Sequence, residues 1–561
     1  MRGSLRDQGS TVAASWHAST LAPFQSRVFF AVWSATLVSN FGSLIQAVGA
    51  SWLMTSLAPS PDMVALVQAS TTLPIMLLSL PSGAIADIWD RRIVMLIAQC
   101  VMLVLSTALA LISWLGHITP WTLLTLTFLI GCGVALHGPA WQSSVGEQVP
   151  REHIPAAVGL NTMSYNLART AGPAVGGVIV ATAGPHAAFF TNALTYVALI
   201  VVLLSWRRPK PVMHLPPESM GTAIFAGLRY VRLSPAIRTV LIRGFALGLF
   251  GSSIWALMPL IARDLLGGGA LTYGVLFGSF GVGAVLGALV STTARERLTN
   301  EALVRIAGVV FGVIVAISGA SGWIPLTLGA FVLGGAAWVL MLSTFNITVQ
   351  MSAPRWVVGR ALATYQMVTF GGLAVGSWMW GEIAAVHGLA FALIASGIAL
   401  AAAVLIGVAA PLPRHEALNL APLRPAPPEL PRMDLGPASG PVVVTIEYRV
   451  APEDYAEFAA AMQEVRRIRR RDGGRRWSLL QDMEDPGRWF ERFHSPSWIE
   501  HLRHYHRFTV ADEEIERRAL AFHRGPEPPK IRHLLERSPD SVQTLSERAV
   551  AADPHVPAGP L

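Results

Sequence analysis

The stretch Gly83-Ala84-Ile85-Ala86-Asp87-Ile88-Trp89-Asp90-Arg91-Arg92 joins two long apolar runs, residues 63–86 and 93–115. Each run has about the 20 mostly apolar residues that a helix needs to cross the hydrocarbon core of a bilayer. The junction places two carboxylates and two guanidinium groups side by side, and such groups stay at a membrane surface. The stretch therefore predicts two membrane-spanning helices joined by a short charged loop.

The same alternation of apolar run and polar turn extends on both sides of this loop. Of the 561 residues, 52% are hydrophobic and 14% are charged. Residues 27–410 hold 18 Lys or Arg and 10 Asp or Glu, whereas residues 411–561 hold 22 and 23. The sequence therefore predicts an all-α membrane body followed by a soluble tail. Because the basic excess belongs to the membrane body, it gives no support for nucleic-acid binding.

We expect twelve transmembrane helices in the body. The predicted spans are residues 28–53, 63–86, 93–115, 120–141, 156–181, 187–205, 238–261, 272–293, 301–320, 324–346, 360–384 and 388–410. Basic side chains such as Arg91 and Arg92 gather in alternate loops, and the loops of the other side hold only Arg263. Because cytoplasmic loops carry the excess of Lys and Arg, we expect both termini and the tail in the cytoplasm.

Composition divides the chain into seven parts. They are an N-terminal cytoplasmic arm (1–26), an N-terminal six-helix bundle (27–205), a central cytoplasmic loop (206–236), a C-terminal six-helix bundle (237–410), a Pro-rich linker (411–440), a cytoplasmic domain (441–537) and a disordered tail (538–561).

The two predicted bundles repeat each other. Phe41-Gly42-Ser43 recurs 209 positions later as Phe250-Gly251-Ser252. An offset of 204 pairs Gly172 with Gly376 and Gly177 with Gly381. Repeated bundles imply a substrate path at their interface near the middle of the membrane, which opens to alternate sides as one bundle rocks against the other. The sequence therefore indicates two pseudo-symmetric six-helix bundles and a transporter.

Over essentially all of residues 27–410 the body resembles the major facilitator superfamily (MFS). The stretch from Gly83 to Arg92 is similar to the superfamily's loop signature, although Ile88 stands where the signature has Arg. The resemblance implies a conformational switch, in which charged loop residues hold a neighbouring helix end and Gly83 allows close helix approach. The switch residues are Gly83, Asp87, Asp90, Arg91 and Arg92. The alternative is that Arg91 and Arg92 only anchor the loop at the surface. The equivalent loop of the second half, Ala294-Arg295-Glu296-Arg297, is degenerate.

The fifth predicted span carries a glycine and proline pattern, Gly159, Ala168 and then Gly172-Pro173-Ala174-Val175-Gly176-Gly177. The pattern resembles the motif of the superfamily's exporters, with Ala168 in place of one Gly. Pro173 removes a backbone donor and bends the helix, while Gly159, Gly172, Gly176 and Gly177 allow close packing across the bundle interface. The resemblance implies export. The alternative is a generic packing stripe, and the second half, with Gly376-Ser377, lacks the proline.

Charged groups within membrane spans are costly and indicate function by default. Arg169 lies just before the proline, where it would bind an anionic substrate or respond to a protonatable partner, unless it pairs structurally. Arg243 lies near the start of the seventh span, at the membrane interface. Glu382 lies near the outer end of the eleventh span, where it titrates or forms part of the rim.

Uncharged polar groups complete the substrate or coupling candidates, namely Asn40, Gln46, His137, Asn166 and Tyr365. With aromatic residues such as Trp255 and Trp338 they would line a cavity for a mid-sized amphipathic molecule. The alternative for each is a hydrogen bond that holds two helices together. No carboxylate stands at the centre of the first span, so proton coupling follows from the resemblance alone. We expect no cofactor, no metal and no catalytic residue.

Residues 441–537 have the pattern of a small α+β domain. Val442 to Tyr448 alternate as a strand, and Pro452 opens a helix that ends in an Arg-rich run before Gly473. Residues 475–483 and 488–494 follow as strands, 496–520 as one or two helices and 530–535 as a last strand. This order predicts a ferredoxin-like fold. The domain resembles the small dimeric barrels of the antibiotic-biosynthesis monooxygenase type, which implies possible self-association.

Four histidines of this domain, His494, His501, His504 and His506, invite a metal or catalytic interpretation. Because no carboxylate or cysteine completes a ligand set, we favour a solvated surface or a dimer face.

Body and tail together resemble the transmembrane secretion effectors, a bacterial subgroup near the enterobactin exporter and macrolide efflux pumps. The resemblance implies a secondary transporter, not an enzyme, in the bacterial inner membrane. It would export a siderophore or drug-like compound by proton antiport and alternating access. Its partners would be the lipid bilayer, the small molecule and protons, without nucleic acid. The alternatives are an importer on the same fold and a membrane-tethered enzyme or sensor that acts through the tail.

Overall fold

The structure is a computed structural model that describes residues 21–58, 60–206, 220–354, 356–413, 419–420, 423, 433 and 435–537. The side chains of Asp87, Arg151 and Met220 also lie outside the description. The expectations for residues 1–20 of the arm and for the disordered tail at 538–561 therefore fall outside the described residues. The chain divides into two compact units, which are the membrane body and the tail domain with a few loop residues.

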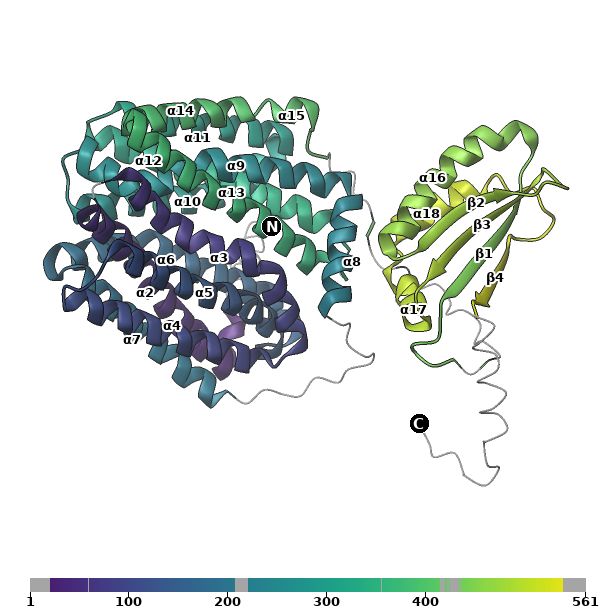
Figure 1. The fold of residues 1–561 in the computed structure, drawn as a ribbon, viewed down its shortest axis with the longest axis horizontal. Helices are drawn as coiled ribbons and strands as arrows, with labels where there is room; N and C mark the ends of the chain where they lie inside the picture. Colours follow the sequence, from purple (N-terminus) through teal and green to yellow (C-terminus); the bar gives the residue numbers. More distant parts are fainter. Residues whose placement is uncertain are drawn as a thin grey trace, which may run out of the picture. The chain divides into compact units, whose positions relative to one another are not determined.

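The body consists of long helices in two sets (Figure 1). The first set is α2 (Arg27–Leu57), α3 (Pro61–Ile88), α4 (Arg91–Trp114), α5 (Pro120–Gln148), α6 (Ile154–Ala183) and α7 (Pro185–Ser205). After α8 (Met220–Leu233), the second set is α9 (Pro235–Leu260) with the short η3 (Ile261–Leu265), α10 (Ala270–Arg297), α11 (Asn300–Ala320), α12 (Ile324–Met351), α13 (Val358–His387) and α14 (Leu389–Ala403) with α15 (Ile406–Ala409). We call these sets the first and second halves.

Ten of the described helices are long and apolar enough to cross a membrane. The helices α6 and α13, each 30 residues long, are not among the ten. Both are rich in glycine and carry polar side chains within their length, such as Asn161 and Arg169 on α6 and Gln366 on α13. Each predicted span lies largely within a helix, but several helices run past the apolar segment, because hydropathy marks only the part that matches hydrocarbon.

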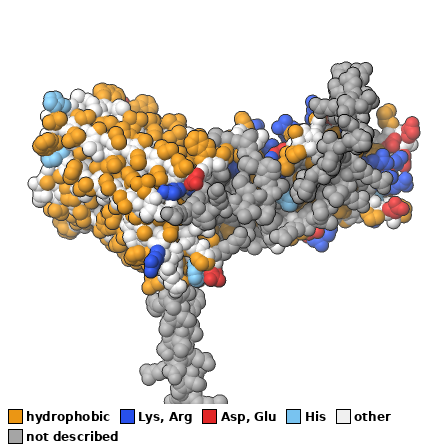
Figure 2. Space-filling view, turned by 90° about the horizontal axis from the view of Figure 1, so that it is seen from below, with side chains coloured by type: hydrophobic (Ala, Val, Ile, Leu, Met, Phe, Trp, Pro, Cys, Tyr) orange, Lys and Arg blue, Asp and Glu red, His pale blue; other side chains and the backbone are white. Residues whose placement is uncertain are grey.

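The outer surface of the body is apolar, as Figure 2 shows for its described part. Large side chains such as Val104, Leu289 and Val386 are 65%, 73% and 74% exposed. A soluble protein rarely exposes so continuous an apolar surface, whereas a membrane protein presents it to lipid.

Helix ends follow from local sequence. Ser26, Asp90, Thr119 and Thr299 are N-caps whose side chains accept a backbone N–H. Gly184 and Gly388, which are 204 positions apart, form the turns after α6 and α13 with φ of 81° and 90°. Glycine adopts these values without a steric penalty. The repeat therefore extends to the backbone conformation of equivalent turns.

The tail domain contains β1 (Val442–Arg449), α16 (Tyr455–Asp472), β2 (Arg475–Gln481), β3 (Arg488–Ser495), α17 (Trp498–Arg507), α18 (Val510–Leu520) and β4 (Lys530–Leu535). The strands form one antiparallel sheet in the order β2-β3-β1-β4. Side chains of one sheet face, such as Ile446 and Tyr448, form a core with Phe458 of α16 and Ala519 of α18. The strands lie within a residue or two of the predicted segments.

Candidate substrate site between the two halves

Arg91, at the start of α4, binds the end of a neighbouring helix. Its Nη1 donates to the carbonyl oxygen of Ser143 (2.9 Å) and pairs with Oε1 of Glu147 (2.7 Å), both on α5. Its Nε donates to the carbonyl oxygen of Ala86 near the end of α3 (3.2 Å). The last carbonyls of a helix have no partner within the helix and attract cations. Arg91 therefore ties three helix ends together.

Arg92 makes the equivalent contact with α7. Its Nε and Nη2 donate to the carbonyl oxygens of Leu203 (2.7 Å) and Leu204 (2.8 Å). Asp90 caps α4 by accepting the backbone N–H of Arg92 (2.9 Å). The interpretation of these arginines as mere surface anchors does not describe their geometry, because each binds specific backbone carbonyls.

Asp87 and Gly83 are the two remaining residues of the predicted switch. The side chain of Asp87 lies outside the described part of the chain. Gly83 makes no close helix contact in this conformation, because a methyl group there would meet no atom within 4 Å. The sequence signal was a motif glycine, which does not say in which conformation the glycine packs.

The second half also has arginines that bind neighbouring helices, despite its degenerate loop sequence. Arg295 Nη2 donates to Oγ of Ser343 on α12 (2.7 Å), and Arg305 Nη2 donates to the carbonyl oxygen of Gly407 on α15 (2.9 Å). The Arg305 contact joins the third and the sixth long helix of its half, as the Arg92 contact does. The Arg295 contact instead joins the second and the fourth, whose counterparts in the first half are α3 and α5. Neither contact was predicted, because the two arginines no longer stand side by side in sequence.

Glycines of α6 pack against α2 within the first half. A methyl group at Gly172 would lie 3.1 Å from Cβ of Leu44, and one at Gly176 would lie 3.0 Å from Cα of Ile45. Gly159, at the other end of the predicted pattern, would meet nothing within 4 Å. The pattern therefore has one glycine that faces open space and others that permit close contact.

Across the interface of the halves, α6 packs on α10. A methyl group at Gly177 would lie 3.0 Å from Cα of Gly274, and one at Gly281 would lie 2.5 Å from the carbonyl oxygen of Arg169. Proline lacks the N–H that would bond this carbonyl, four residues earlier, so Pro173 leaves it without its helical donor. The carbonyl oxygen that lacks its helical donor therefore faces Gly281, which has no side chain, and α6 and α10 come close together at this point. The glycines of α10 were not predicted, although their spacing in the sequence is visible.

The side chain of Arg169 extends from α6 towards an aromatic cluster of the second half. Its guanidinium carbon lies 5.3 Å from the ring centre of Trp255 on α9 and 5.7 Å from that of Phe280 on α10. Trp255 also contacts Trp338 of α12, with ring centres 5.9 Å apart. Aromatic faces attract cations, most strongly where water is excluded.

Among the described residues, Arg169 has no ion pair and no side-chain hydrogen bond. The indole N–H of Trp255 is buried and has no acceptor in the described part of the chain. A buried N–H without an acceptor carries a free-energy penalty, and so does a cation in a membrane without a counter-charge. The site therefore presents two donors to the interface and supplies no acceptor for either.

Two other candidates hold helices together within the first half. Gln46 Oε1 accepts from Oγ of Ser106 (2.6 Å) and Nδ2 of Asn192 (2.8 Å), so it joins α2 to α4 and α7. His137 Nδ1 lies 3.4 Å from Nε2 of Gln99 on α4. Both have the helix-joining role that was the alternative to substrate binding.

Arg243 was expected at the membrane interface, but it is buried and belongs to an ion cluster. It is 5% exposed and pairs with Glu301 of α11. Glu301 also pairs with Arg305 (2.6 Å) and accepts the backbone N–H of Leu412 (2.9 Å). Because its charge is matched, Arg243 has a structural role, which also fixes the chain just after α15.

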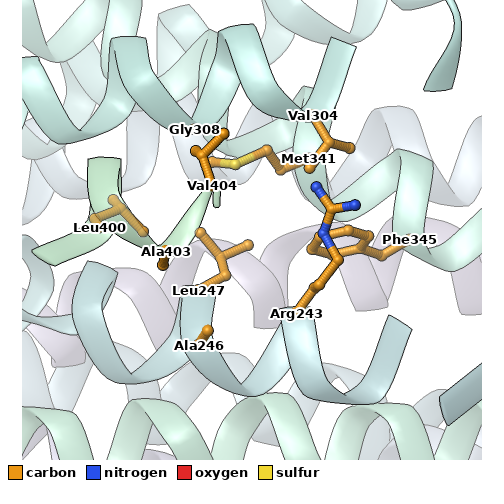
Figure 3. A pocket seen from close by; sticks show the side chains of 10 residues that line it. All are labelled: Arg243, Ala246, Leu247, Val304, Gly308, Met341, Phe345, Leu400, Ala403 and Val404. Atoms are coloured by element: carbon orange, nitrogen blue, oxygen red, sulfur yellow. The ribbon is translucent and has the colours of Figure 1, made fainter. Parts of the chain in front are cut away.

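A small cavity lies beside Arg243 within the second half (Figure 3). Its volume is about 30 Å³ and its other lining residues are apolar, among them Leu247, Met341 and Phe345. This volume has room for only a few water molecules, so the cavity is too small for a substrate.

The remaining candidates lie apart. Tyr365 is buried on α13, where its ring would lie 3.2 Å from a methyl group at Gly244. Glu382 is exposed near the other end of α13. Asn40 and Asn166 are half-buried, and Asn166 precedes Arg169 by three residues, which places the two on neighbouring positions of one helix face. Asn166 is therefore one helical turn from Arg169, whereas Glu382 lies outside this site.

The halves also meet at the end of the body opposite Arg91. Arg263 Nη1 donates to the carbonyl oxygen of Thr55 at the end of α2 (2.6 Å), and the rings of Trp52 and Tyr273 stack with centres 6.5 Å apart. On α13, a methyl group at Gly381 would lie 3.0 Å from Cα of Asp62 on α3. All these contacts lie on one side of Arg169 along the helices, so the halves are packed together at the Arg263 end.

The histidines of the tail domain correct a second expectation. His494, His501 and His504 are 7%, 1% and 5% exposed, so these three do not form a solvated surface, whereas His506 is exposed as expected. Burial lowers the pKa of His501 to about 4 and holds the pKa of His504 well below its usual value, the latter helped by nearby Arg469. No group of three or more His, Cys, Asp or Glu among the described residues has the geometry to hold a metal ion.

The Arg-rich end of α16 turns inward. Arg469 Nε pairs with the fully buried Glu491 of β3 (3.1 Å), and its Nη2 pairs with Glu516 of α18. Arg471 bridges Asp472 (2.9 Å) and Asp512. The sequence indicated a favourable interaction with the helix dipole, but it could not show which arginines enter the core.

A comparison with known families and proteins shows matches to membrane transporters. The family of transmembrane secretion effectors matches residues 18–540. An uncharacterised MFS-type transporter of Bacillus subtilis, YfiS, is 29% identical over 353 residues, which are 61% of this chain and 82% of the relative. The multidrug efflux pump Tap of Mycolicibacterium fortuitum is 24% identical, over 69% of this chain and 96% of the pump. The staphyloferrin A transporter of Staphylococcus aureus is 22% identical, over 50% of this chain and 70% of that transporter.

Solved structures match the body. A bacterial homologue of the human lysosomal transporter Spinster, inward-facing and unoccupied, has a TM-score of 0.54 at 14% identity, over 69% of this chain and 95% of that one. A POT family transporter in complex with 5-aminolevulinic acid has a TM-score of 0.57 at 15% identity, over 68% of this chain and 96% of that transporter. At such identities the likeness shows the fold alone.

Proposed function

The chain belongs to the family of transmembrane secretion effectors, and from that premise we propose that it exports a small molecule, a siderophore or drug-like compound, by proton antiport and alternating access. It is a multi-pass membrane transporter with a small-molecule substrate, and its family and relatives are transporters of this fold rather than enzymes. The direction of transport, the proton coupling and the substrate class are the proposed parts.

The unpaired guanidinium of Arg169 is the observation that carries the proposal. It lies at the interface of the halves, over Trp255 and Phe280, and the buried indole N–H next to it also lacks an acceptor. An amphipathic molecule with an anionic group would supply the missing acceptor and place its apolar part on the aromatic rings. We therefore propose that the exported molecule carries a carboxylate or a similar anion.

The places where the halves are packed support the proposed alternating access. Contacts such as Arg263 with Thr55 close one end of the body, and the glycine contacts of α6 with α10 extend to the level of Arg169. Rocking about the Arg169 level would separate the Arg263 end and bring the Arg91 end together. We propose that Gly83 and Gly159, which face open space here, pack against neighbours in that second conformation.

The finer architecture is part of the proposal. We infer twelve spans in two six-helix bundles, because α6 and α13 connect spanning helices and are 30 residues long. We also propose that both termini are cytoplasmic, in a bacterial inner membrane. The strand order β2-β3-β1-β4 supports a ferredoxin-like tail domain. Self-association through this domain is a further hypothesis, which cross-linking of the full chain in membranes would test.

Everted membrane vesicles from a host without its own efflux pumps test the function. Their lumen corresponds to the outside of the cell and is acidified by respiration. We expect the organic anion carboxyfluorescein to enter the lumen against its passive distribution, because a weak acid would otherwise collect on the alkaline side. A protonophore should abolish this uptake.

Uptake that ignores the proton gradient would contradict antiport. Uptake by intact cells instead of everted vesicles would favour the importer. If carboxyfluorescein, a labelled macrolide and a labelled siderophore all give the same signal as vesicles from the empty host, the proposed export of this substrate class is wrong.

A further inference from the structure

The two faces of the tail sheet differ in what covers them. Side chains alternate between the faces of a strand, and those of Val444, Ile446 and Tyr448 pack against α16 and α18. Figure 1 shows the helices of this domain on one side of its sheet. The opposite face carries the alternate residues, such as Thr445 and Glu447 of β1, and we call it the open face.

The strand registers bring basic side chains of the open face together. Arg492 of β3 and Arg532 of β4 both stand opposite Thr445, and Lys530 stands opposite Glu447. Six cations belong to this face, namely Arg449, Arg475, Arg488, Arg492, Lys530 and Arg532. Among the described residues, Glu447 is the acidic side chain of the face within these rows, and two carboxylates border them, Asp482 at 3.8 Å from Arg488 and Glu536 at 3.3 Å from His494.

One of the six cations is neutralised and the others are not. Arg488 pairs with Glu447 (2.8 Å). The other five, Arg449, Arg475, Arg492, Lys530 and Arg532, are exposed and have no ion pair among the described residues. This contrasts with the inner side of the same domain, where Arg469 and Arg471 are paired with carboxylates. Arg467 and Arg470 of α16 are also exposed without an ion pair among the described residues, but the five cations of the open face stand together on one face of the sheet.

Exposed apolar side chains accompany the cations. Leu480 of β2 is 47% exposed and Leu534 of β4 is 52% exposed, and both belong to the open face by register. Phe490 of β3 stands opposite Leu480 and is half-buried, with the guanidinium of Arg488 5.7 Å from its ring centre. Cations mixed with exposed leucines and an aromatic ring are typical of a surface that lies at a lipid headgroup layer.

We propose that the open face of the tail domain binds the anionic headgroups of the bilayer that its own chain spans. The segment of 30 residues between the body and the domain, 411–440, reaches at most about 100 Å, so headgroups are always within reach. Anionic lipids attract basic segments close to the membrane surface, and the attraction grows with each Lys or Arg. A second copy of the face would instead place five unmatched cations against five others, which like-charge repulsion opposes.

The test uses the full chain in lipid nanodiscs. Replacing Cys100 and Cys132 by Ser and Ser478 by Cys gives one thiol on the open face, which takes a donor dye. Nanodiscs that contain an acceptor-labelled lipid then report the distance of the dye from the bilayer. We expect higher energy transfer with about 30% phosphatidylglycerol than with phosphatidylcholine alone, and loss of the difference in 0.5 M NaCl because salt screens the attraction.

Charge reversal separates the open face from the rest of the domain. R492E/R532E should abolish the response to phosphatidylglycerol, and R492Q/R532Q should weaken it several-fold. The matched control is R467E/R470E on α16, which changes the charge equally at two exposed positions away from the face. It should keep most of the response. Hydrogen exchange of β1 in each variant checks that the domain is folded.

Equal energy transfer in the two lipid mixtures would overturn the proposal, and so would an equal loss in the control variant. A disulfide between the thiols of two copies, formed equally in neutral and anionic lipid, would assign the face to self-association. Retention of a single-stranded RNA by the wild type but not by R492E/R532E, without a lipid response, would assign it to nucleic acid.

Discussion

The helices α6 and α13 occupy equivalent places in the two halves and use their glycines in the same way. Gly172 of α6 packs on α2, and its counterpart Gly376 of α13 packs on Leu249 of α9. Gly177 contacts α10 across the interface, and its counterpart Gly381 contacts α3 across the same interface. The glycines of the exporter-like pattern are therefore part of a scaffold that both halves share.

The helices differ where the offset of 204 pairs Arg169 with Leu373 and Pro173 with Ser377. Leu373 is a buried apolar residue, 4% exposed, whereas Arg169 extends to the aromatic cluster of the other half. Features that the repeat preserves serve packing, and features that break it are the better candidates for function. This comparison selects Arg169 and Pro173 from a pattern whose glycines alone do not indicate a direction of transport.

Replacing Arg169 removes this difference between α6 and α13, and we expect it to have the largest effect on transport. R169Q keeps a polar side chain but removes the charge that the substrate anion would meet. Losing a buried charge partner costs about 2–5 kcal/mol, so the initial rate of carboxyfluorescein uptake at low concentration should fall roughly 30-fold or more. R169K should retain part of the rate. Unchanged uptake by R169Q would refute the assignment of this residue.

Adding one methyl group to a glycine of α6 tests the scaffold. In G177A the methyl group would lie 2.9 Å from the carbonyl oxygen of Ala270 and 3.0 Å from Cα of Gly274, so α6 and α10 must move apart. Overpacking of this kind costs about 1–3 kcal/mol, and the melting temperature of the purified protein should fall by several degrees. G159A is the control in the same pattern, because nothing lies within 4 Å, and it should melt like the wild type.

The counterpart Gly381 sharpens this prediction. If both halves share the scaffold, G381A should lower the melting temperature about as much as G177A, since its methyl group would meet Ala65 and Asp62 of α3. A drop for G177A without one for G381A would mean that the glycine pattern belongs to the first half alone.

Replacing the arginines at the Arg91 end of the body also compares the two halves, and we expect a smaller effect on uptake. R91A removes a partly exposed ion pair to Glu147 and two backbone contacts, whereas R295A removes a hydrogen bond to Ser343. We expect uptake to fall several-fold in R91A and about twofold in R295A, because charged hydrogen bonds contribute about 1.5–3 kcal/mol when intact. A larger loss in R295A would show that the second loop, despite its degenerate sequence, is the main switch.

Lowering the pH should destabilise the tail domain and leave the stability of the body unchanged, which is the smallest effect that we expect. The pKa of His501 lies at about 4 in the folded domain because of burial, against about 6.5 in an unfolded chain. Stability from the neutral imidazole is therefore present above pH 6.5 and is lost as the pH falls towards 4. Scanning fluorimetry of the full chain should show the transition of the tail moving down over this range, less so in H501F, while that of the body stays constant.

The sequence predicted the helices of the body well, because apolar length and glycine or proline turns are local signals. It placed the tail strands within a residue or two for the same reason. It also marked Arg169 and Arg91, since a charge in or beside a membrane span is conspicuous. The family match then confirmed the resemblance that the loop and the exporter-like pattern indicate.

Sequence could not predict what depends on partners distant along the chain. Arg243 looked interfacial until Glu301, 58 residues away, was placed beside it. His501 and His504 of α17 looked as solvated as His506 is, because an amphipathic helix does not show which of its polar residues enter a core. The role of Phe280 beside Arg169 also requires the packing of α10 on α6, which no local pattern specifies.

Access to the Arg169 level from the two sides of the membrane tests the central claim most directly. N166C in a C100S/C132S background places one thiol a single turn from Arg169 and keeps the arginine. Membrane-impermeant maleimide should modify it from either side, in right-side-out and in everted vesicles, and carboxyfluorescein should slow both reactions. Modification from one side only, under every proton gradient applied, would contradict an alternating site between the two halves.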